Sequence, residues 1–179
     1  MTSWFFGYGS LVNRDTHSYP QAQQATLRGW RRTWVRTALR DVVFLSIHKA
    51  PGHSINGLIA AVPQADWTAL DTREAGYSRF AATDHIVHGA EASDIAAYQV
   101  PPALQRHDGD HCMLLSYLDV VVQGFLREFG QAGVEAFFDT TDNWAIPVHD
   151  DRGQPRYPRA TQVSREEQAL VDRLLAQVQ

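Results

Sequence analysis

The apolar residues change their spacing along the chain, and this change limits the folds that the sequence can adopt. Segments of strand character fill the first part, whereas the longest segments with helical spacing come late. We expect strands at 3–7, 26–39, 41–49, 54–63, 77–89 and 94–100, and helices at 63–77, 111–130, 132–141 and 164–178. This order, without repeats or a linker, predicts one α+β domain over residues 1–179.

The predicted strand at 26–39 alternates arginine with tryptophan. Arg28, Trp30, Arg32, Trp34 and Arg36 fall on one predicted face. We interpret this face as solvated, with the arginines lying over the tryptophans. A surface that binds phosphates or single-stranded nucleic acid is the alternative. It fits poorly with 20 acidic residues, 16 basic residues and a net charge of −4, so we expect no nucleic-acid partner.

The sequence also bears on location. No apolar run reaches the length of about 18 residues that a membrane-spanning helix needs. No basic segment followed by an apolar stretch and a cleavage site marks a signal peptide. Cys112 is the only cysteine, so no disulfide can form within the chain. We therefore expect a cytoplasmic protein with no membrane partner.

The first predicted strand ends in the sequence Gly-Tyr-Gly-Ser. Two glycines around Tyr8 are more than a turn requires, and they allow the backbone to approach another group closely. Amides near Gly9, together with the Ser10 hydroxyl, would form a nest for an anionic or carbonyl oxygen. The alternative is an ordinary strand end against which Tyr8 packs.

Glu74 is the most informative charged residue. It shares a helical stripe with Trp67 and Leu70, which must face the core. Burial and the nearby C-terminal end of the helix would both raise the pKa of its carboxyl group. A carboxyl group tuned in this way can exchange protons near neutral pH. The alternative is a structural ion pair with Arg73 or Arg79.

Other catalytic centres find little support in the sequence. The eight histidines form no HExxH motif and no ligand pair with a carboxylate. Ser10 does not lie in a GxSxG elbow, and Cys112 has no triad signature. No glycine motif for phosphates or dinucleotides occurs. We therefore expect neither a metal nor a cofactor.

Two motifs together, FGYGSL and, farther along, LDTREAGY, resemble the γ-glutamylcyclotransferase superfamily. The second motif is similar to the ChaC-type branch, which acts on glutathione, and so is the intervening LRGWRRTW. SYLDVVVQG resembles the helix that supplies a substrate-facing tyrosine in related proteins. The resemblance covers roughly residues 3–130 and implies a mixed, barrel-like β-sheet with flanking helices.

The resemblance also implies a reaction and a set of roles. The α-amine of a γ-glutamyl compound would attack its own amide carbonyl, form 5-oxoproline and release the attached amine. The nucleophile then belongs to the substrate, which agrees with the lack of a serine, cysteine or metal centre. The implied roles are substrate binding for Tyr8, Gly9, Ser10, Leu11 and Tyr117, and general acid/base catalysis for Glu74.

Several alternatives stay open at this point. The substrate is glutathione, a γ-glutamyl-amino acid or a γ-glutamylamine. The chain could instead be a non-catalytic small-molecule binding module of the same fold, although such a module would not need Glu74. The proline-rich segment 142–163 is predicted to be extended and to wrap a surface. Its stretch 142–160 does not match the ChaC-type tails, and it would close the pocket or change its selectivity.

Overall fold

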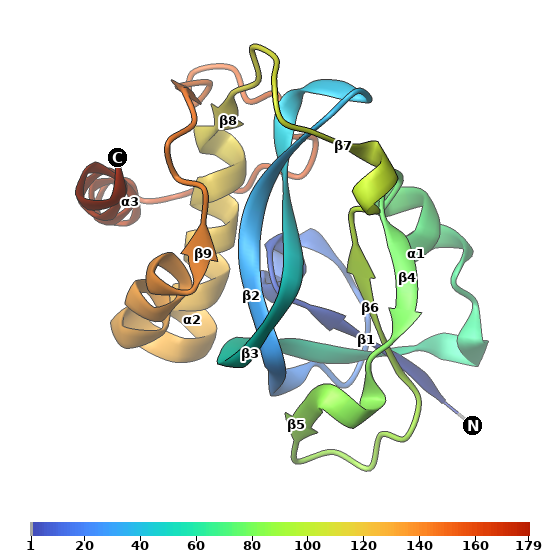
Figure 1. The fold of residues 1–179 in the computed structure, drawn as a ribbon. Coiled ribbons are helices and arrows are strands. Elements are labelled where there is room, and N and C mark those ends of the chain that lie inside the picture. Colours follow the sequence, from blue (N-terminus) through green and yellow to red (C-terminus); the bar gives the residue numbers. More distant parts are fainter. Residues whose placement is uncertain (1) are drawn as a thin grey trace.

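The computed structural model describes residues 2–179 and contains a curled, mixed β-sheet with helices packed beside it (Figure 1). The strands are β1 Ser3–Gly7, β2 Gln23–Thr37, β3 Arg40–Val62, β4 Ser78–Ala81, β5 Ile86–His88, β6 Ile95–Gln99, β7 Gln105–Arg106, β8 Met113–Leu114, β9 Thr141–Asp142 and β10 Val148–His149. The α-helices are α1 Thr68–Arg73, α2 Leu115–Asp139 and α3 Arg165–Val178. The predicted α+β class with a barrel-like sheet is confirmed.

The main sheet has the order β4-β6-β1-β3-β2-β5, with β7 and β9 also paired to β2. β1 lies in its interior, antiparallel to β3 and parallel to β6. All five residues of β1 are buried, which explains why this strand is a continuous apolar run rather than an alternating one. The Tyr8–Leu11 loop therefore leaves the sheet from a strand that is held on both sides.

The prediction that β2 carries a solvated arginine face is wrong. Gly29 has a φ of +81°, and the pairing with β3 shifts its register between Arg28 and Trp30. A bulge of this kind adds a residue and changes which side chains point inward. Trp30, Arg32 and Trp34 are consequently buried in the core, with 4%, 1% and 2% of their surface exposed, while Arg28 is exposed.

The strands predicted separately at 41–49 and 54–63, with a turn at 51–53 between them, are one strand in the structure. The chain does not reverse there, and β3 is one long strand in which residues 50–53 lie opposite the Gly29 bulge. Gly52 has a φ of +85°, so the Pro-Gly-His sequence forms the irregular part of this strand. The Pro-Gly-His sequence, which is typical of a turn, forms a bulge here, because β2 and β3 stay paired on both sides of it.

The helix predicted at 63–77 is shorter in the structure. Residues Pro63–Ala65 form a separate 3₁₀ turn, in which Gln64 has a φ of 58°. α1 then begins at Thr68, whose amide donates to the Asp66 carboxylate at 3.0 Å. Glu74 follows the last residue of α1 and closes the helix with a bond from its amide to the Leu70 carbonyl.

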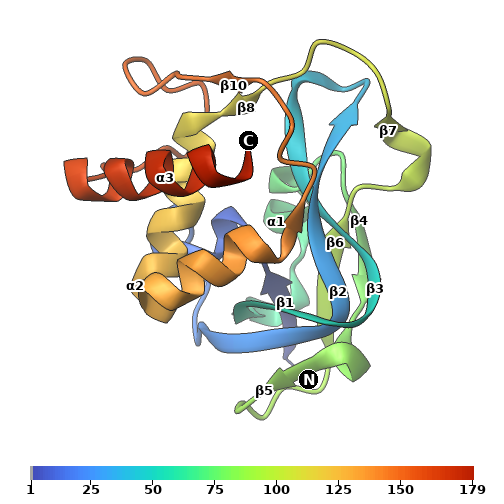
Figure 2. The same ribbon diagram turned by 60° about the vertical axis from the view of Figure 1, so that its left-hand side comes forward.

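The two helices predicted on either side of Gly130 are joined in α2. Gly130 nevertheless interrupts the helical geometry, with φ of 67° and ψ of −171°. The helix predicted at 164–178 is confirmed as α3, and it begins with a capping box in which Ser164 and Glu167 bond reciprocally to each other's backbone amides. Figure 2 shows α2 and α3 together on one side of β2 and β3.

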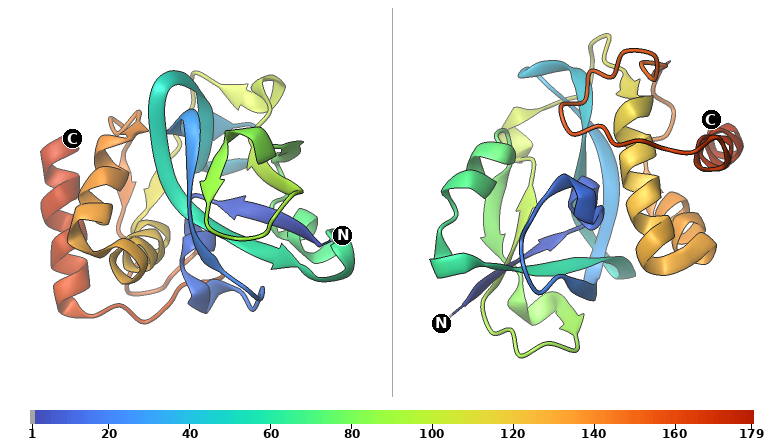
Figure 3. Two further views of the ribbon diagram at one scale, coloured as in Figure 1. Left: turned by 90° about the horizontal axis from the view of Figure 1, so that it is seen from below. Right: turned by 180° about the vertical axis from the view of Figure 1, so that it is seen from behind.

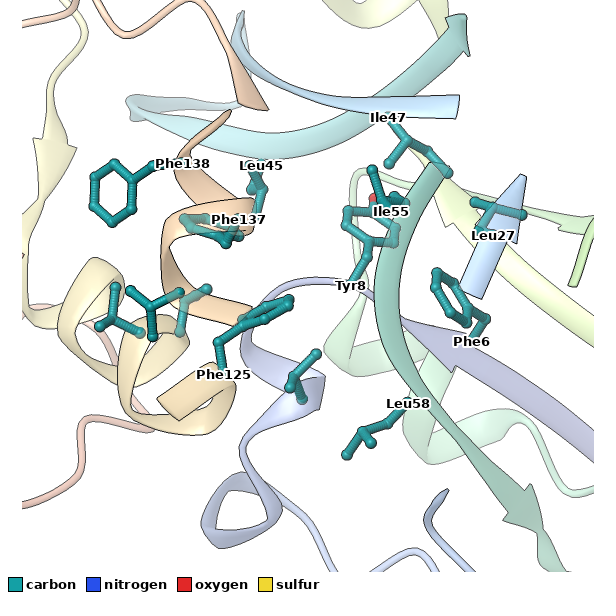
Figure 4. Packing of buried hydrophobic residues seen from close by; sticks show 14 of the residues in the cluster. Phe6, Tyr8, Leu27, Leu45, Ile47, Ile55, Leu58, Phe125, Phe137 and Phe138 are labelled. Carbon is teal, nitrogen blue, oxygen red and sulfur yellow. The ribbon is translucent and has the colours of Figure 1, made fainter. Parts of the chain in front are cut away.

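The main core lies between α2 and the sheet. Figure 4 shows Phe125 and Phe137 on the α2 side of this cluster, and Phe6, Tyr8 and Ile47 on the sheet side. Within residues 2–179, no helix combines the length and apolar character needed to cross a membrane. The core places the start of α2 and the end of β1 close together, and the site described below is built there.

Gly130→Ala should lower the free energy of unfolding by about 1–3 kcal/mol, because its φ and ψ are open almost only to glycine. Gly153→Ala is the matched control: neither glycine has atoms within 4 Å of the added Cβ, but Gly153 has no positive φ. Urea unfolding of both variants measures the difference. Equal stabilities would show that the break at Gly130 carries no strain.

Candidate functional site

The predicted site residues border two connected hollows. The larger is a cavity of about 610 Å³ whose wall includes Ser10, Glu74 and Tyr117. A much smaller hollow, of about 30 Å³, shares these three residues and reaches the backbone of Gly9. The first is large enough for a small peptide, whereas the second has room for about one water-sized group.

Glu74 lies in this site at the C-terminal end of α1. Its side chain is 15% exposed, and burial raises the pKa of its carboxyl group above the usual 4.5. Arg73 and Arg159 act in the opposite direction, since their positive charges favour the carboxylate. The arrangement therefore has both features of the sequence prediction: a carboxyl group with a raised pKa and an ion pair with Arg73.

Arg73 connects the carboxylate to the loop after β1. Its Nε lies 3.2 Å from Glu74 Oε1, and its Nη2 lies 3.2 Å from Ser10 Oγ. The same guanidinium donates to the carbonyl and hydroxyl oxygens of Thr16 at 2.8 and 3.0 Å. Only 7% of the Arg73 side chain is exposed. Glu74 and Ser10 are thus held by one rigid, nearly buried group.

The loop amides have the character of an oxygen-binding nest. Within residues 2–179, the amides of Gly9, Ser10 and Leu11 donate to no backbone carbonyl. Val12 and the buried Asn13 close the loop by donating to the Gly9 and Ser10 carbonyls at 2.9 and 3.1 Å. The Ser10 amide is directed at the Tyr117 hydroxyl oxygen, which lowers the pKa of that phenol slightly against the effect of burial. Loop amides beside a hollow of this size can hold one anionic or carbonyl oxygen.

Gly9 is required by the position of Tyr117. A Cβ at Gly9 would lie 2.8 Å from the Tyr117 hydroxyl and 3.1 Å from Leu45 Cδ2. Tyr117 comes from the first turns of α2, and burial raises the pKa of its phenol. It is therefore neutral near pH 7 and can donate a hydrogen bond into the site. The close approach predicted for Gly9 is, in the first place, to this hydroxyl.

Arg32 binds the beginning of the Tyr8–Leu11 loop from the core side. Its Nε donates to the Tyr8 carbonyl at 2.8 Å, and its other nitrogens reach Thr140 Oγ1 and the Asn56 carbonyl. Phe125 and Phe137 cover its guanidinium at 4.9 and 5.0 Å from their ring centroids. Burial lowers its pKa to about 9, so Arg32 stays charged at neutral pH.

Two of the predicted substrate-binding side chains are occupied elsewhere. The Tyr8 hydroxyl donates to the Tyr98 carbonyl at 2.8 Å, as expected from the packing alternative. Leu11 is buried, and its Cβ fills the space that a side chain at position 7 would need. Both residues still line the small hollow. Their roles as substrate contacts stay predictions, as do those of Gly9, Ser10, Tyr117 and Glu74.

The sequence analysis missed several residues of the cavity wall. Tyr77 lies within the LDTREAGY motif but was given no role, and Arg73 was named only as an ion-pair partner of Glu74. The Tyr77 hydroxyl donates to the Leu45 carbonyl at 2.9 Å. Tyr157 and Arg159 come from the extended segment before α3. That segment has no periodic signal, so its side chains could not be placed from sequence. Within residues 2–179, no three His, Cys, Asp or Glu side chains are grouped to hold a metal ion.

Comparisons with known proteins agree on one family and one fold. A sequence model of the family described as "ChaC-like protein" matches residues 3–100, more than half of the chain. No curated protein sequence matches this chain. A solved structure titled "Gamma-glutamyl cyclotransferase" is similar with a TM-score of 0.60 and 15% identity, covering 97% of this chain and 99% of that chain.

Two further solved structures share this fold. The uncharacterized human protein loc79017 has a TM-score of 0.62 at 14% identity, covering 96% of this chain and 98% of that one. YkqA from Bacillus subtilis has a TM-score of 0.60 at 15% identity, covering 75% of this chain and 52% of that one. At such identities the likeness establishes the fold.

Gly9→Ala should destabilise the protein, because its Cβ would press against the Tyr117 hydroxyl. An overpacked position of this kind costs about 1–3 kcal/mol. Tyr117→Phe removes the oxygen atom that the Cβ would meet, so the double variant should be more stable than the two separate losses predict. Urea unfolding of the four proteins measures this coupling. Strict additivity would contradict the contact.

Glu74→Gln should become more stable relative to the wild type as the pH rises. Because burial raises the pKa of Glu74, the native state binds its proton more tightly than the unfolded state. The wild type therefore loses stability from about pH 4.5 upward through the native pKa, and glutamine has no such loss. Unfolding free energies from pH 4 to pH 8 test this, with the exposed Glu91→Gln as control. A constant difference between Glu74→Gln and wild type would refute the raised pKa.

Proposed function

The chain belongs to the ChaC-like family, and we propose that it converts a γ-glutamyl compound to 5-oxoproline and the released amine. The observation that supports this most is the position of Glu74: a largely buried carboxyl group with a raised pKa that lines the same small hollow as the loop after β1. Such a group can move protons, and the amides can stabilise the charge that develops on an oxygen.

In the proposed reaction the nucleophile is the α-amine of the substrate. Glu74, as a carboxylate, takes a proton from the α-ammonium, and the amine nitrogen then bonds to the γ-carbonyl carbon. The tetrahedral intermediate collapses by breaking the bond between this carbon and the leaving nitrogen. Glu74 gives its proton to the leaving nitrogen. A second proton of the former ammonium is also transferred to the leaving nitrogen, so the lactam nitrogen keeps one. The products are the lactam and a protonated amine, so atoms and charge balance.

The cavity would supply most of the rate by holding the substrate in a bent conformation. Well-oriented intramolecular reactions reach effective molarities of roughly 10⁵ M or more. Gly9, Ser10 and Leu11 line a hollow with room for one oxygen, and their amides donate to no backbone carbonyl within residues 2–179, which suits the developing oxyanion. The Tyr117 hydroxyl above Gly9 is a further donor at the same place. We propose that these groups bind the reacting end of the substrate.

The cavity is assembled from distant parts of the chain. Ser10 and Arg159 both line it, although they lie near opposite ends of the sequence. This supports the proposal that residues 1–179 act as one domain. It also supports a small-molecule substrate, since the volume of about 610 Å³ suits a ligand of a few residues.

The proposal is tested by measuring 5-oxoproline release from glutathione, γ-glutamyl-alanine and γ-glutamyl-ε-lysine. We expect the wild type to act on at least one of them and Glu74→Gln to lose about 10²–10⁴-fold in kcat, the usual contribution of a general acid/base. Exposed Glu91→Gln should retain wild-type activity. The substrate that is turned over distinguishes a glutathione, γ-glutamyl-amino-acid or γ-glutamylamine enzyme.

Two outcomes would contradict the proposal in different ways. Near-normal turnover by Glu74→Gln would remove Glu74 from the chemistry. No release from any of the three compounds by the wild type, combined with their measurable binding, would favour a non-catalytic binding module of the same fold.

A further inference from the structure

The segment from 151 to 159, here called the strap, is tied to the rest of the molecule at its beginning. Asp151 is 4% exposed, and its carboxylate accepts hydrogen bonds from the Ser116 amide at 2.8 Å and the Ser116 hydroxyl at 2.5 Å. The Arg156 amide donates to the same carboxylate at 2.8 Å. Asp151 thus caps the first turn of α2 from outside the helix and fixes the turn of the strap.

Ion pairs hold the strap at two further points. Arg152 bonds both oxygens of Asp119 at 2.8 Å and reaches Asp172 of α3 at 2.9 Å. Arg156 bonds both oxygens of Asp41, at the start of β3, at 3.0 Å. Figure 3 (right) shows the segment before α3 crossing the upper end of α2. The strap is therefore a fixed wall of the cavity.

This anchoring places the end of the strap over the catalytic end of the cavity. The Tyr157 ring packs edge-on against Tyr117, with centroids 5.0 Å apart. Arg159 and Glu74 line the same cavity, and the positive charge of Arg159 lowers the pKa of Glu74. The strap thus adds a cation to the part of the cavity that holds Glu74.

Arg159 differs from the other arginines of the cavity in its contacts. Arg73 is bonded to Glu74, Arg156 is bonded to Asp41, and Arg40 lies over the Phe44 ring. Within residues 2–179, Arg159 makes no hydrogen bond or ion pair, although part of its surface is buried. Its guanidinium is available to a ligand.

We propose that Arg159 binds the α-carboxylate of the γ-glutamyl group, while Glu74 faces the α-ammonium on the same carbon. This inference rests on the proposed function and names how its substrate is recognised. An α-amino acid carries one anionic and one cationic group on a single carbon, and Arg159 and Glu74 present the opposite pair of charges. A guanidinium can bind a carboxylate through two parallel hydrogen bonds.

The small hollow supports the same assignment. Its volume of about 30 Å³ has room for one oxygen atom and its neighbours, but it offers little room for a carboxylate beside the reacting carbonyl. If the loop amides hold the oxyanion there, the α-carboxylate must bind elsewhere. Of the four arginines that line the cavity, Arg159 is the one to which residues 2–179 offer no hydrogen bond, ion pair or aromatic ring.

The test compares three substrates that differ in one charge. These are γ-glutamyl-alanine, the same compound with its α-carboxyl group amidated, and the same compound with the alanine carboxyl group amidated. Arg159→Gln should raise KM for the first and third by about 10- to 100-fold, the usual value of a charged hydrogen bond. For the compound with the amidated α-carboxyl group, the KM values of wild type and Arg159→Gln should agree within about twofold. Arg173 is exposed and forms no ion pair with any residue from 2 to 179, so Arg173→Gln is the matched control and should behave as wild type.

Two other results would overturn the inference. An equal effect of Arg159→Gln on all three substrates would show that Arg159 does not contact a substrate carboxylate. An effect that disappears only with the amidated alanine would place the carboxylate of the leaving group at Arg159. In both cases turnover that depends on Glu74 would leave the proposed function intact.

Two measurements keep the inference separate from turnover. Calorimetry should measure the binding of γ-glutamyl-alanine to Glu74→Gln and to the double variant Glu74→Gln/Arg159→Gln. The double variant should bind about 10- to 100-fold more weakly than Glu74→Gln, even if no product forms. Undetectable binding to Glu74→Gln, or binding unaffected by Arg159→Gln, would contradict the inference. The acid limb of the kcat/KM profile should also move to higher pH in Arg159→Gln, because the pKa of Glu74 rises when this cation is removed.

Discussion

The buried guanidinium of Arg32 is the contact on which the site depends. Within the described residues 2–179 it has no carboxylate partner, and it bonds instead to the Tyr8 carbonyl, the Asn56 carbonyl and the Thr140 hydroxyl. These three acceptors belong to the loop after β1, to β3 and to the end of α2. One charged group therefore fixes the distance between the sheet, the long helix and the loop. An unpaired ion in a core is costly unless its donors are satisfied, so this packing tolerates little displacement of any of the three.

A second arginine repeats this arrangement on the other side of the loop. Arg73 bonds Ser10 and Thr16 while it pairs with Glu74. The loop is thus held from the core by Arg32 and from α1 by Arg73, and its residues line the small hollow. Donors that are fixed before the substrate arrives need no reorganisation during a reaction, and this is the condition under which they stabilise charge most effectively.

The parts of the site that depend on local sequence could be predicted, whereas the parts that depend on contacts between distant residues could not. Glu74 and the Gly-Tyr-Gly-Ser loop carry local signals: helical spacing, a strand end and paired glycines. The burial of Arg32 could not be predicted, because it follows from the bulge at Gly29, which is defined only against β3. The position of Arg159 has the same limitation. It is set by ion pairs with residues far away in sequence, and an extended segment has no periodicity that would indicate which side chains point inward.

The strap also has a consequence for how the protein is made. The loop and Glu74 belong to the first half of the chain, whereas the wall that carries Arg159 precedes only the last helix. During synthesis, which runs from the N-terminus, the carboxyl group and its loop emerge long before the cavity can close around a ligand. A nascent or truncated chain would have the reactive groups but only an open groove. The binding site is therefore complete only after the strap has been synthesised and anchored.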